Sequence, residues 1–240
     1  MAAEEPVVSV WTRPQRRREQ PALSRAQIVA AALELLDANG LEALSMRTLG
    51  ARLDAAATSL YRHVANKDEL LELVVDEVYG QIEVPDVRDG EWRRAVTACA
   101  ESARAALLRH AWIASVLGQT GLAYLGPNVM RLNERMLALF EAAGFSLAEA
   151  DHALSAVMAY VIGTATAEAA WLTTVSRSGR SEREWIDRLR PALTEATKPY
   201  ARLHALATAL DDDAGKSRGD GFHYGLDRML DGLTTRLAGR

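Results

Sequence analysis

A chain of 240 residues can form one large domain or a small domain joined to a medium one, and its 49% apolar and 25% charged residues exclude a disordered chain. Its single cysteine excludes an internal disulfide framework and a cysteine-based zinc site, which suits a reducing cytosol. The net charge of −4 argues against a protein that compacts DNA through a basic surface, so any nucleic-acid contact must depend on locally clustered charge.

The first 22 residues are predicted to be a flexible basic arm. They contain three prolines and no sustained helical period, and arginine occupies positions 13, 16, 17 and 18. Such an arm can follow a narrow minor groove of DNA, and a solvated tail without a binding role explains the same residues. The N-terminus has no long apolar region, so we expect no signal peptide and a cytoplasmic location.

A small helical domain is predicted over residues 23–84. Ser24 and Gln27 have the spacing of a capping box at the start of its first helix, which Gly40 ends. Asn66 begins a later helix, whose apolar side chains recur on one face as Leu70, Leu71, Val74, Val75 and Val78. Residues 85–90 contain a proline and a glycine and form the boundary to the rest of the chain.

Residues 46–64 have the layout of a helix-turn-helix, in which two short helices are joined by a tight turn and the second can enter the major groove. A plain helical hairpin has the same layout. Leu60 and Val64 face the core at i and i+4, however, and this spacing leaves polar and aromatic side chains on the outer face: Thr58, Ser59, Tyr61, Arg62 and His63. Because such side chains contact phosphates and base edges, the pattern favours a DNA-binding helix over about residues 57–63.

The same region resembles the DNA-binding domain of the TetR family of repressors. The resemblance rests on residues 31–35, Gly40-Leu41 and the run Leu60-Tyr61-Arg62-His63-Val64-Ala65-Asn66-Lys67-Asp68-Glu69-Leu70-Leu71. It implies DNA contacts by Arg47, Ala57, Thr58, Ser59, Tyr61, Arg62, His63 and Lys67. Of these, Tyr61 and Lys67 match positions that mostly contact phosphates, and Arg62 is the best candidate for a guanine contact.

The turn of the helix-turn-helix departs from the family pattern. It reads Asp54-Ala55-Ala56 where family members usually have a glycine, so we expect Asp54 to adopt the left-handed conformation in glycine's place. Ala57 stands where a larger base-reading residue can occur. Its methyl group can still touch a thymine methyl, but direct base reading then depends mainly on Arg62.

Residues 91–240 are predicted to form a second all-helical domain, which makes the fold class all-α. Helices are expected at about residues 91–110, 112–117, 128–143, 147–174, 184–209 with breaks near Pro191 and Pro199, and 222–237. The polar segments 176–181 and 211–221 are predicted to be mobile loops. Residues 111–130 are uncharged and long enough to span a membrane, but their glycines, proline and polar side chains predict a short helix and a loop, and we expect no membrane contact.

One helix of this domain is predicted to form a subunit interface. Residues 152–167 contain no acidic residue, lysine or arginine and are apolar on more than one face, so this helix should be buried nearly all round. The downstream segments 142–147, 153–157 and 222–227 resemble the effector-binding half of tetracycline repressors, in which this helix and the final one form a four-helix interface in a homodimer. A purely intramolecular core helix is the alternative.

The predicted ligand pocket differs from that of a tetracycline repressor. Positions that bind the drug and magnesium in those proteins are, by an approximate alignment, Glu83, Cys99, Leu117 and Met136, so magnesium-tetracycline is not expected. A more apolar pocket with a few polar anchors is predicted instead, lined by Cys99, Ala103, Trp112, Leu117, Asn133, Met136, Glu168 and Trp171. Each of these residues can equally belong to an ordinary core.

Together these patterns predict a transcriptional regulator that a small molecule releases from a palindromic double-stranded DNA operator. The helix over residues 67–83 would carry the motion, because it joins the two domains. An activator and a regulator without an effector are alternatives. An enzyme is disfavoured because the sequence has no Gly-x-Ser-x-Gly elbow, no phosphate-binding glycine loop and no histidine pair at metal spacing, and neither a cofactor nor a metal is expected.

Overall fold

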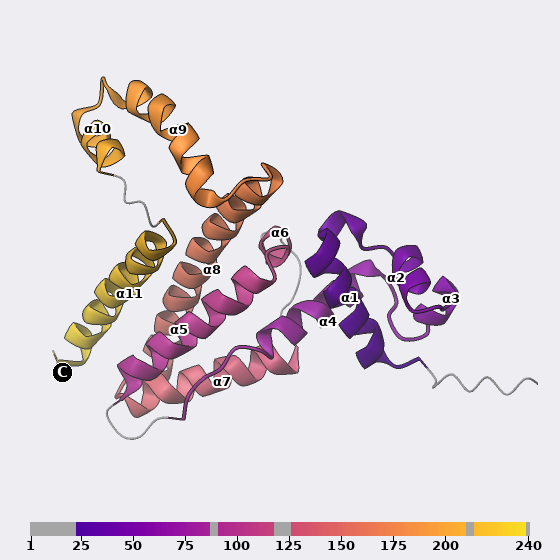
Figure 1. The fold of residues 1–240 in the computed structure, drawn as a ribbon. Helices are drawn as coiled ribbons and strands as arrows, with labels where there is room; N and C mark the ends of the chain where they lie inside the picture. The colour runs from indigo at the N-terminus through magenta and orange to yellow at the C-terminus, as the bar shows by residue number, and fades with distance from the viewer. Residues whose placement is uncertain (1–22, 87–90, 118–125, 210–213, 239–240) are drawn as a thin grey trace, which may run out of the picture.

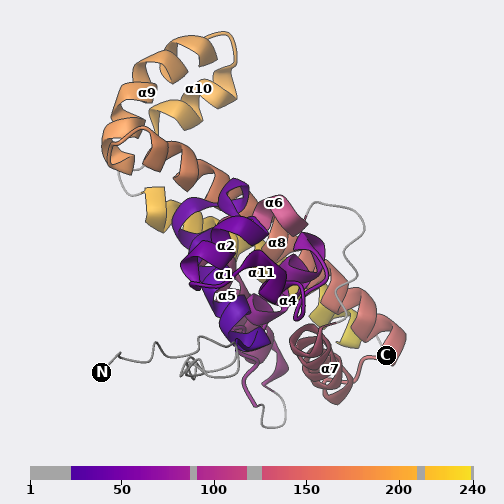
Figure 2. The same cartoon turned by 90° about the vertical axis from the view of Figure 1, so that its right-hand side faces the viewer.

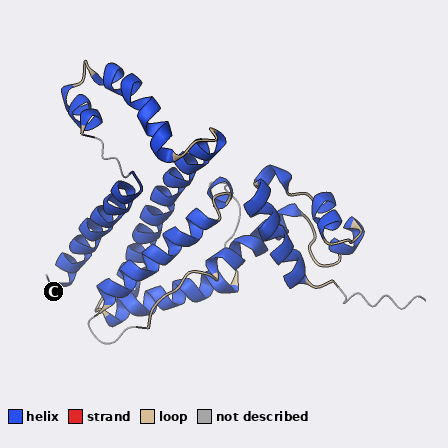
Figure 3. Ribbon diagram, in the orientation of Figure 1, coloured by secondary structure: helices blue, strands red, loops and turns tan. Residues whose placement is uncertain are grey.

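The computed structural model describes residues 23–86, 91–117, 126–209 and 214–238, and every regular element in these ranges is helical (Figures 1 and 3). This confirms the predicted all-α class. The predicted arm, residues 1–22, lies outside the described residues, as does much of the uncharged stretch 111–130.

The first helices form a small domain, here called the head, at one side of the molecule (Figure 1). It consists of α1 (Arg25–Asn39), the 3₁₀ turn η1 (Leu41–Ala43), α2 (Met46–Arg52), α3 (Ala57–Leu60) and the first half of α4 (Lys67–Tyr79). Helix α3 is shorter than predicted, because residues 61–63 form a turn rather than a further helical turn. The head buries a core that includes Ile28, Leu49, Leu60, Val64 and Leu70.

Local capping signals start the helices of the head, and α1 and α4 begin where the sequence predicts, whereas α4 ends at Tyr79 rather than at residue 83. Ser24, Ser45 and Asn66 each accept the backbone N–H of the residue three positions on, at 3.2, 3.1 and 2.8 Å. Gly40 ends α1 with φ of 76°, a left-handed value that glycine adopts without steric cost. The limits of these elements therefore follow from single residues.

The turn between α2 and α3 has the predicted left-handed residue. Asp54 has φ of 48°, and it is the one non-glycine residue with positive φ in the described part of the chain. The turn also packs closely on α2 at Gly50. A Cβ added there would lie only 2.7 Å from the carbonyl oxygen of Ala55. Asp54 thus takes the conformational role of the family's glycine, while Gly50 allows the close approach.

We expect Asp54→Val to lower the free energy of unfolding by about 1–2 kcal/mol relative to Asp54→Gly, because a β-branched side chain is strained at positive φ. Urea denaturation of the two variants measures the difference. Ala56→Val is the matched control, since Ala56 is exposed in the same turn with an ordinary φ of −65°. Equal stabilities for Asp54→Val and Asp54→Gly would contradict the left-handed turn.

The second domain, here called the body, is a helical bundle into which α4 leads from the head (Figures 1 and 2). It comprises α5 (Trp92–Arg109), α6 (Ile113–Leu117), α7 (Pro127–Ala142), α8 (Leu147–Arg177) and α11 (Ala214–Ala238). Helices α5 and α7 pack on α8, and α11 lies along the other side of α8. The rings of Trp92, Phe140 and Phe145 pack together and close the bundle at the end where α8 begins.

Two further helices, α9 (Glu182–Thr197) and α10 (Ala201–Thr208), form an arm that projects beyond the end of α8 (Figures 1 and 2). They pack on each other and meet the rest of the described chain mainly at the end of α8. Several large apolar side chains of this arm are exposed to solvent, namely Leu189, Tyr200, Leu203 and Leu206.

Helix limits in this region differ from two predictions. Helix α9 continues through Pro191, so the predicted break there is wrong, whereas the break near Pro199 is confirmed. Pro191 is exposed, and water can solvate the carbonyl group that loses its helical hydrogen bond. Helix α11 begins at Ala214, so residues 214–221 are helical rather than a loop, because ion pairs of Arg218 hold this glycine-rich turn against the bundle.

Candidate DNA-binding face and ligand pocket

The outer face of the segment around α3 carries the side chains that the sequence places there. Leu60 and Val64 are 0% and 1% exposed, whereas Tyr61 is 52% exposed and Thr58 and Arg62 are exposed as well. Ser59 and His63, predicted to lie on the same face, are half-buried. The outward orientation is therefore confirmed for Thr58, Tyr61 and Arg62, and contact of these groups with DNA remains a prediction.

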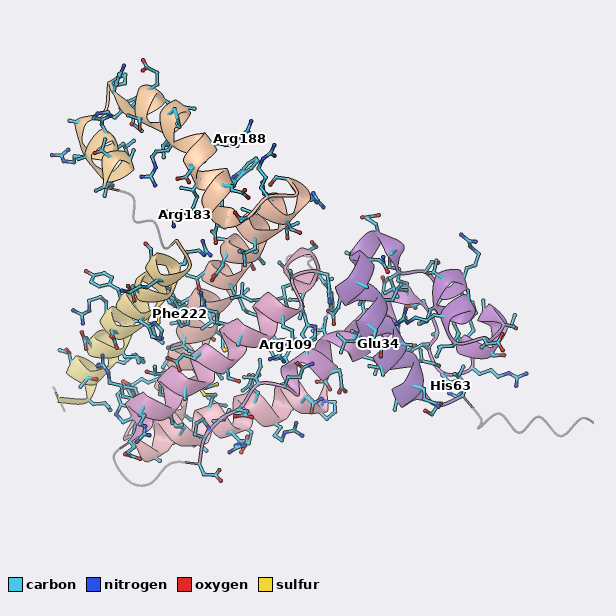
Figure 4. The ribbon with its side chains drawn as sticks, in the orientation of Figure 1. Glu34, His63, Arg109, Arg183, Arg188 and Phe222 are labelled. Carbon is cyan, nitrogen blue, oxygen red and sulfur yellow. The ribbon has the colours of Figure 1, made fainter. Side chains whose placement is uncertain are left out.

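The basic residues near this face are not equivalent. Arg47 is exposed on α2, and Lys67 is half-buried at the start of α4 with Nζ 3.5 Å from the Leu41 carbonyl oxygen. Arg52 instead forms an ion pair with Glu34 of α1, with 2.6 Å between its guanidinium nitrogen and the carboxylate oxygen. Glu34 is labelled in Figure 4. Part of the positive charge in this region is thus neutralised within the head. Arg47, Arg62 and Lys67 can face a phosphate backbone, as can the exposed Arg25, whose Nε donates to the His63 carbonyl oxygen at 3.3 Å.

The predicted pocket residues fall into separate parts of the body. Cys99 and Ala103 of α5 and Met136 of α7 are all at most 1% exposed and belong to one apolar core. Leu117 and Asn133 are half-buried on α6 and α7. An open groove of about 600 Å³ lies elsewhere, on the outer surface of α5, and the predicted residues do not line it.

Glu168 and Trp171 belong to an ionic network at the root of the arm. Glu168, 10% exposed, accepts hydrogen bonds from Arg104 at 2.6 Å and from Arg218 at 3.2 Å. Arg218 also pairs with Glu182, the first residue of α9, to which Trp171 donates its indole N–H. The hydrogen bond from Arg218 is the main cause of the lowered pKa of Glu182. Arg104 also lies over the ring of Phe222, which is labelled in Figure 4. Glu168 and Trp171, both predicted to line the pocket, thus have partners within the protein.

Burial raises the pKa of the Cys99 thiol to about 12, so at mildly alkaline pH the folded protein should not react with dithiobis(nitrobenzoate). The thiolate is the reactive form, and both its population and its exposure are small here. We expect one reactive thiol per chain only after unfolding in guanidinium chloride. Rapid stoichiometric labelling of the folded protein would contradict the buried position, and the unfolded sample controls for the reagent.

Comparison with known proteins accounts for both domains. The family model described as "Bacterial regulatory proteins, tetR family" matches residues 28–74, and that described as "Tetracyclin repressor-like, C-terminal domain" matches residues 84–237. The chain belongs to the TetR family. Members of this family are DNA-binding transcriptional regulators, which confirms the predicted family and the expectation of a regulator rather than an enzyme.

Curated relatives and solved structures agree with this assignment. A transcriptional regulator of Saccharopolyspora erythraea is 43% identical over 164 residues, which cover 68% of this chain and 69% of the relative. The repressor DrrR1 of Streptomyces coeruleorubidus is 35% identical over 225 residues, covering 93% and 82% of the two chains. The structure of the TetR-family protein ActR of Streptomyces coelicolor with actinorhodin has a TM-score of 0.72 at 34% identity and covers 88% of this chain and 95% of ActR.

In this TetR-family chain a polar contact that the sequence does not predict joins the head to the body. Asp37, near the end of α1, accepts the indole N–H of Trp112 at 2.8 Å and lies 2.7 Å from Nδ1 of the buried His110. Gln81, just after α4, is 3.1 Å from Nε2 of the same ring. Trp112, predicted to line the pocket, thus also connects the body to the head. No sequence spacing could indicate the pair Asp37 and His110, because 73 positions separate them.

Proposed function

We propose that this TetR-family regulator is a homodimeric repressor that binds a palindromic operator and leaves it when a largely apolar, polycyclic molecule occupies the body. The observation that carries the proposal is the polar outer face of α3, which lies over the fully buried Leu60 in a chain whose two parts match the TetR family. Arg62 would read bases, and Tyr61 and Lys67 would contact phosphates. The full set of proposed DNA contacts is Arg47, Ala57, Thr58, Ser59, Tyr61, Arg62, His63 and Lys67. Such a protein acts in the cytoplasm, where the DNA is.

An uncovered face of α8 supports the homodimer. Among the described residues, α8 is the one helix that is long and apolar enough to cross a membrane. Only 33% of its most apolar stretch of 18 residues, however, is buried within the protomer. Between residues 153 and 170 the exposed positions are all small, namely Ser155, Ala156, Ala159, Gly163, Ala167 and Ala170. The prediction of a helix buried nearly all round is therefore wrong for one protomer, and a second copy of α8 and α11 packed on this face would bury it.

The effector is proposed from the body's apolar core and from one neighbour. ActR, which is similar over most of this chain, has been crystallised with actinorhodin. The buried side chains of Cys99, Ala103 and Met136 would offer an apolar wall to a flat ring system once α5 and α7 separate. The remaining predicted lining residues, Trp112, Leu117, Asn133, Glu168 and Trp171, would supply its edges and polar anchors.

Operator selection followed by release tests the proposal. Duplexes are selected from random sequence with the full-length protein, and gel shifts measure affinity for the selected sequence and for a scrambled one as salt rises. We expect a palindromic sequence and an affinity that falls steeply with salt. Actinorhodin and fractionated cell extract are then added, and mass spectrometry identifies what stays bound. Failure to enrich any sequence would contradict the regulator, and binding that no compound or extract reverses would contradict the effector.

A further inference from the structure

A buried carboxylate joins the helix that leaves the head to a helix of the body. Asp76 of α4 is 8% exposed, and its Oδ1 accepts the backbone N–H groups of Asn128 and Val129, each at 3.0 Å. These are the first free amides of α7, which Pro127 begins. The side chain of Asn128 also donates to Oδ2 and to the backbone carbonyl of Asp76, both at 3.0 Å. Asp76 therefore caps α7 from another helix, where the helix dipole favours a negative charge.

Two glycines make room for this contact. Gly80 and Gly126 have φ of −61° and −64°, so their backbone conformations suit any residue. A Cβ added at Gly126, however, would lie 2.1 Å from Oδ1 of Asp76, and one at Gly80 would lie 2.9 Å from Nδ2 of Asn128. Close approach thus requires glycine at position 126, where any side chain must either shift the Asp76 side chain or separate α4 from α7, and both changes break the contact.

The position of the contact gives it a mechanical role. The first half of α4 packs on α1 through buried side chains such as Leu70 and Val74, so it moves with the head. Helix α7 packs on α5 and α8 and contributes the buried Met136 to the core where the ligand is proposed to enter. Because this core is closely packed, a ligand there must displace α5 or α7.

We infer that Asp76, Asn128 and Val129, with Gly80 and Gly126, form a clamp through which displacement of α7 turns α4 and the head. The inference rests on the proposed function for the ligand and the operator, but the mechanical connection itself requires neither. Breaking the clamp should leave both domains folded and uncouple them. Coupling between two such sites typically changes an equilibrium by roughly 5- to 150-fold.

Hydrogen exchange of the full-length protein, with and without its selected operator duplex, tests the clamp. In the unmodified protein we expect the duplex to slow exchange of the Asn128 and Val129 amides by roughly fivefold or more, although α7 is outside the head. In Asp76→Asn an amide donor would face the amide donor of Asn128, so these amides should exchange faster and lose the effect of the duplex. Glu77→Gln is the matched control, since it removes one charge from the exposed neighbour on α4.

A second variant keeps the test informative if Asp76→Asn is less stable. Gly126→Ala leaves every polar group of the contact in place, but its Cβ would clash with Asp76, so it should break the clamp without changing any charge. An unchanged response to the duplex in both Asp76→Asn and Gly126→Ala would overturn the inference.

The outcomes separate the clamp from the proposed function. A protein that enriches no duplex contradicts the proposed function. Hydrogen exchange of the protein without DNA then tests whether the clamp connects α4 to α7. In that case Gly126→Ala should accelerate exchange in the second half of α4 together with the first turn of α7. Acceleration confined to α7 would overturn the clamp.

Discussion

Ala159→Arg is expected to turn the protein into a monomer in sedimentation at micromolar concentration. Ala159 is exposed near the middle of α8, on the small-residue face proposed to meet a second copy. A guanidinium group at this position would be desolvated without a partner in the closed interface, which costs several kcal/mol. The same substitution in a single chain would meet only solvent, so the fold should remain intact.

Loss of the dimer should in turn lower operator affinity by about a hundredfold or more, because two linked heads bind two half-sites with a high effective concentration. Gel shifts on a full palindrome and on one half-site measure this loss. Ala138→Arg, at an exposed position of α7, adds the same charge away from the proposed interface and should change neither property. A dimer that persists in Ala159→Arg would show that the face of α8 is not the interface.

Arg62→Ala is expected to abolish discrimination at one base pair of each half-site, at a cost of about 1–3 kcal/mol for the preferred sequence only. Its side chain is exposed beside the buried Val64, and the small Ala57 leaves few other base-reading groups. Lys67→Ala should instead weaken binding to all sequences and reduce the salt dependence by about one phosphate contact. Binding to a set of single-base operator variants at several salt concentrations distinguishes the two effects.

Arg52→Ala is the control for these variants. It removes the same charge as Arg62→Ala, but Arg52 pairs with Glu34 within the head. We expect little change in affinity or sequence preference. If Arg62→Ala lowered affinity equally for every sequence, Arg62 would be a phosphate contact and the base-reading role would be wrong.

The parts of the fold that depend on neighbouring residues could be predicted from the sequence. Side chains at Ser24, Ser45 and Asn66 satisfy the first free amides of their helices, so each start is determined within four residues. Asp54 was predictable for the same reason, since a turn that lacks glycine leaves few residues able to adopt positive φ. The outward set of side chains around α3 followed from the i and i+4 spacing of Leu60 and Val64.

What the sequence did not reveal depends on contacts between distant segments. The first turns of α11 are rich in glycine, and contacts with distant segments explain why they are helical, among them the ion pairs of Arg218 with α8 and α9 and the hydrogen bond from Tyr160 to the Phe222 carbonyl oxygen. The Asp76 contact joins positions 52 residues apart, and a buried aspartate on an apolar helix face has no local signature. For the ligand pocket, residue type alone could not separate core positions such as Met136 from Trp171, which bonds to the arm.

The arm of α9 and α10 has a consequence for how the molecule denatures. Its apolar side chains Leu203 and Leu206 are exposed, and its support from the bundle is concentrated at Glu182 and the end of α8. A segment with so little buried surface opens at a lower free energy than the bundle does. We therefore expect the protein to melt in stages, with the arm opening before the bundle, and its calorimetric enthalpy of unfolding to exceed the van't Hoff value of the main transition.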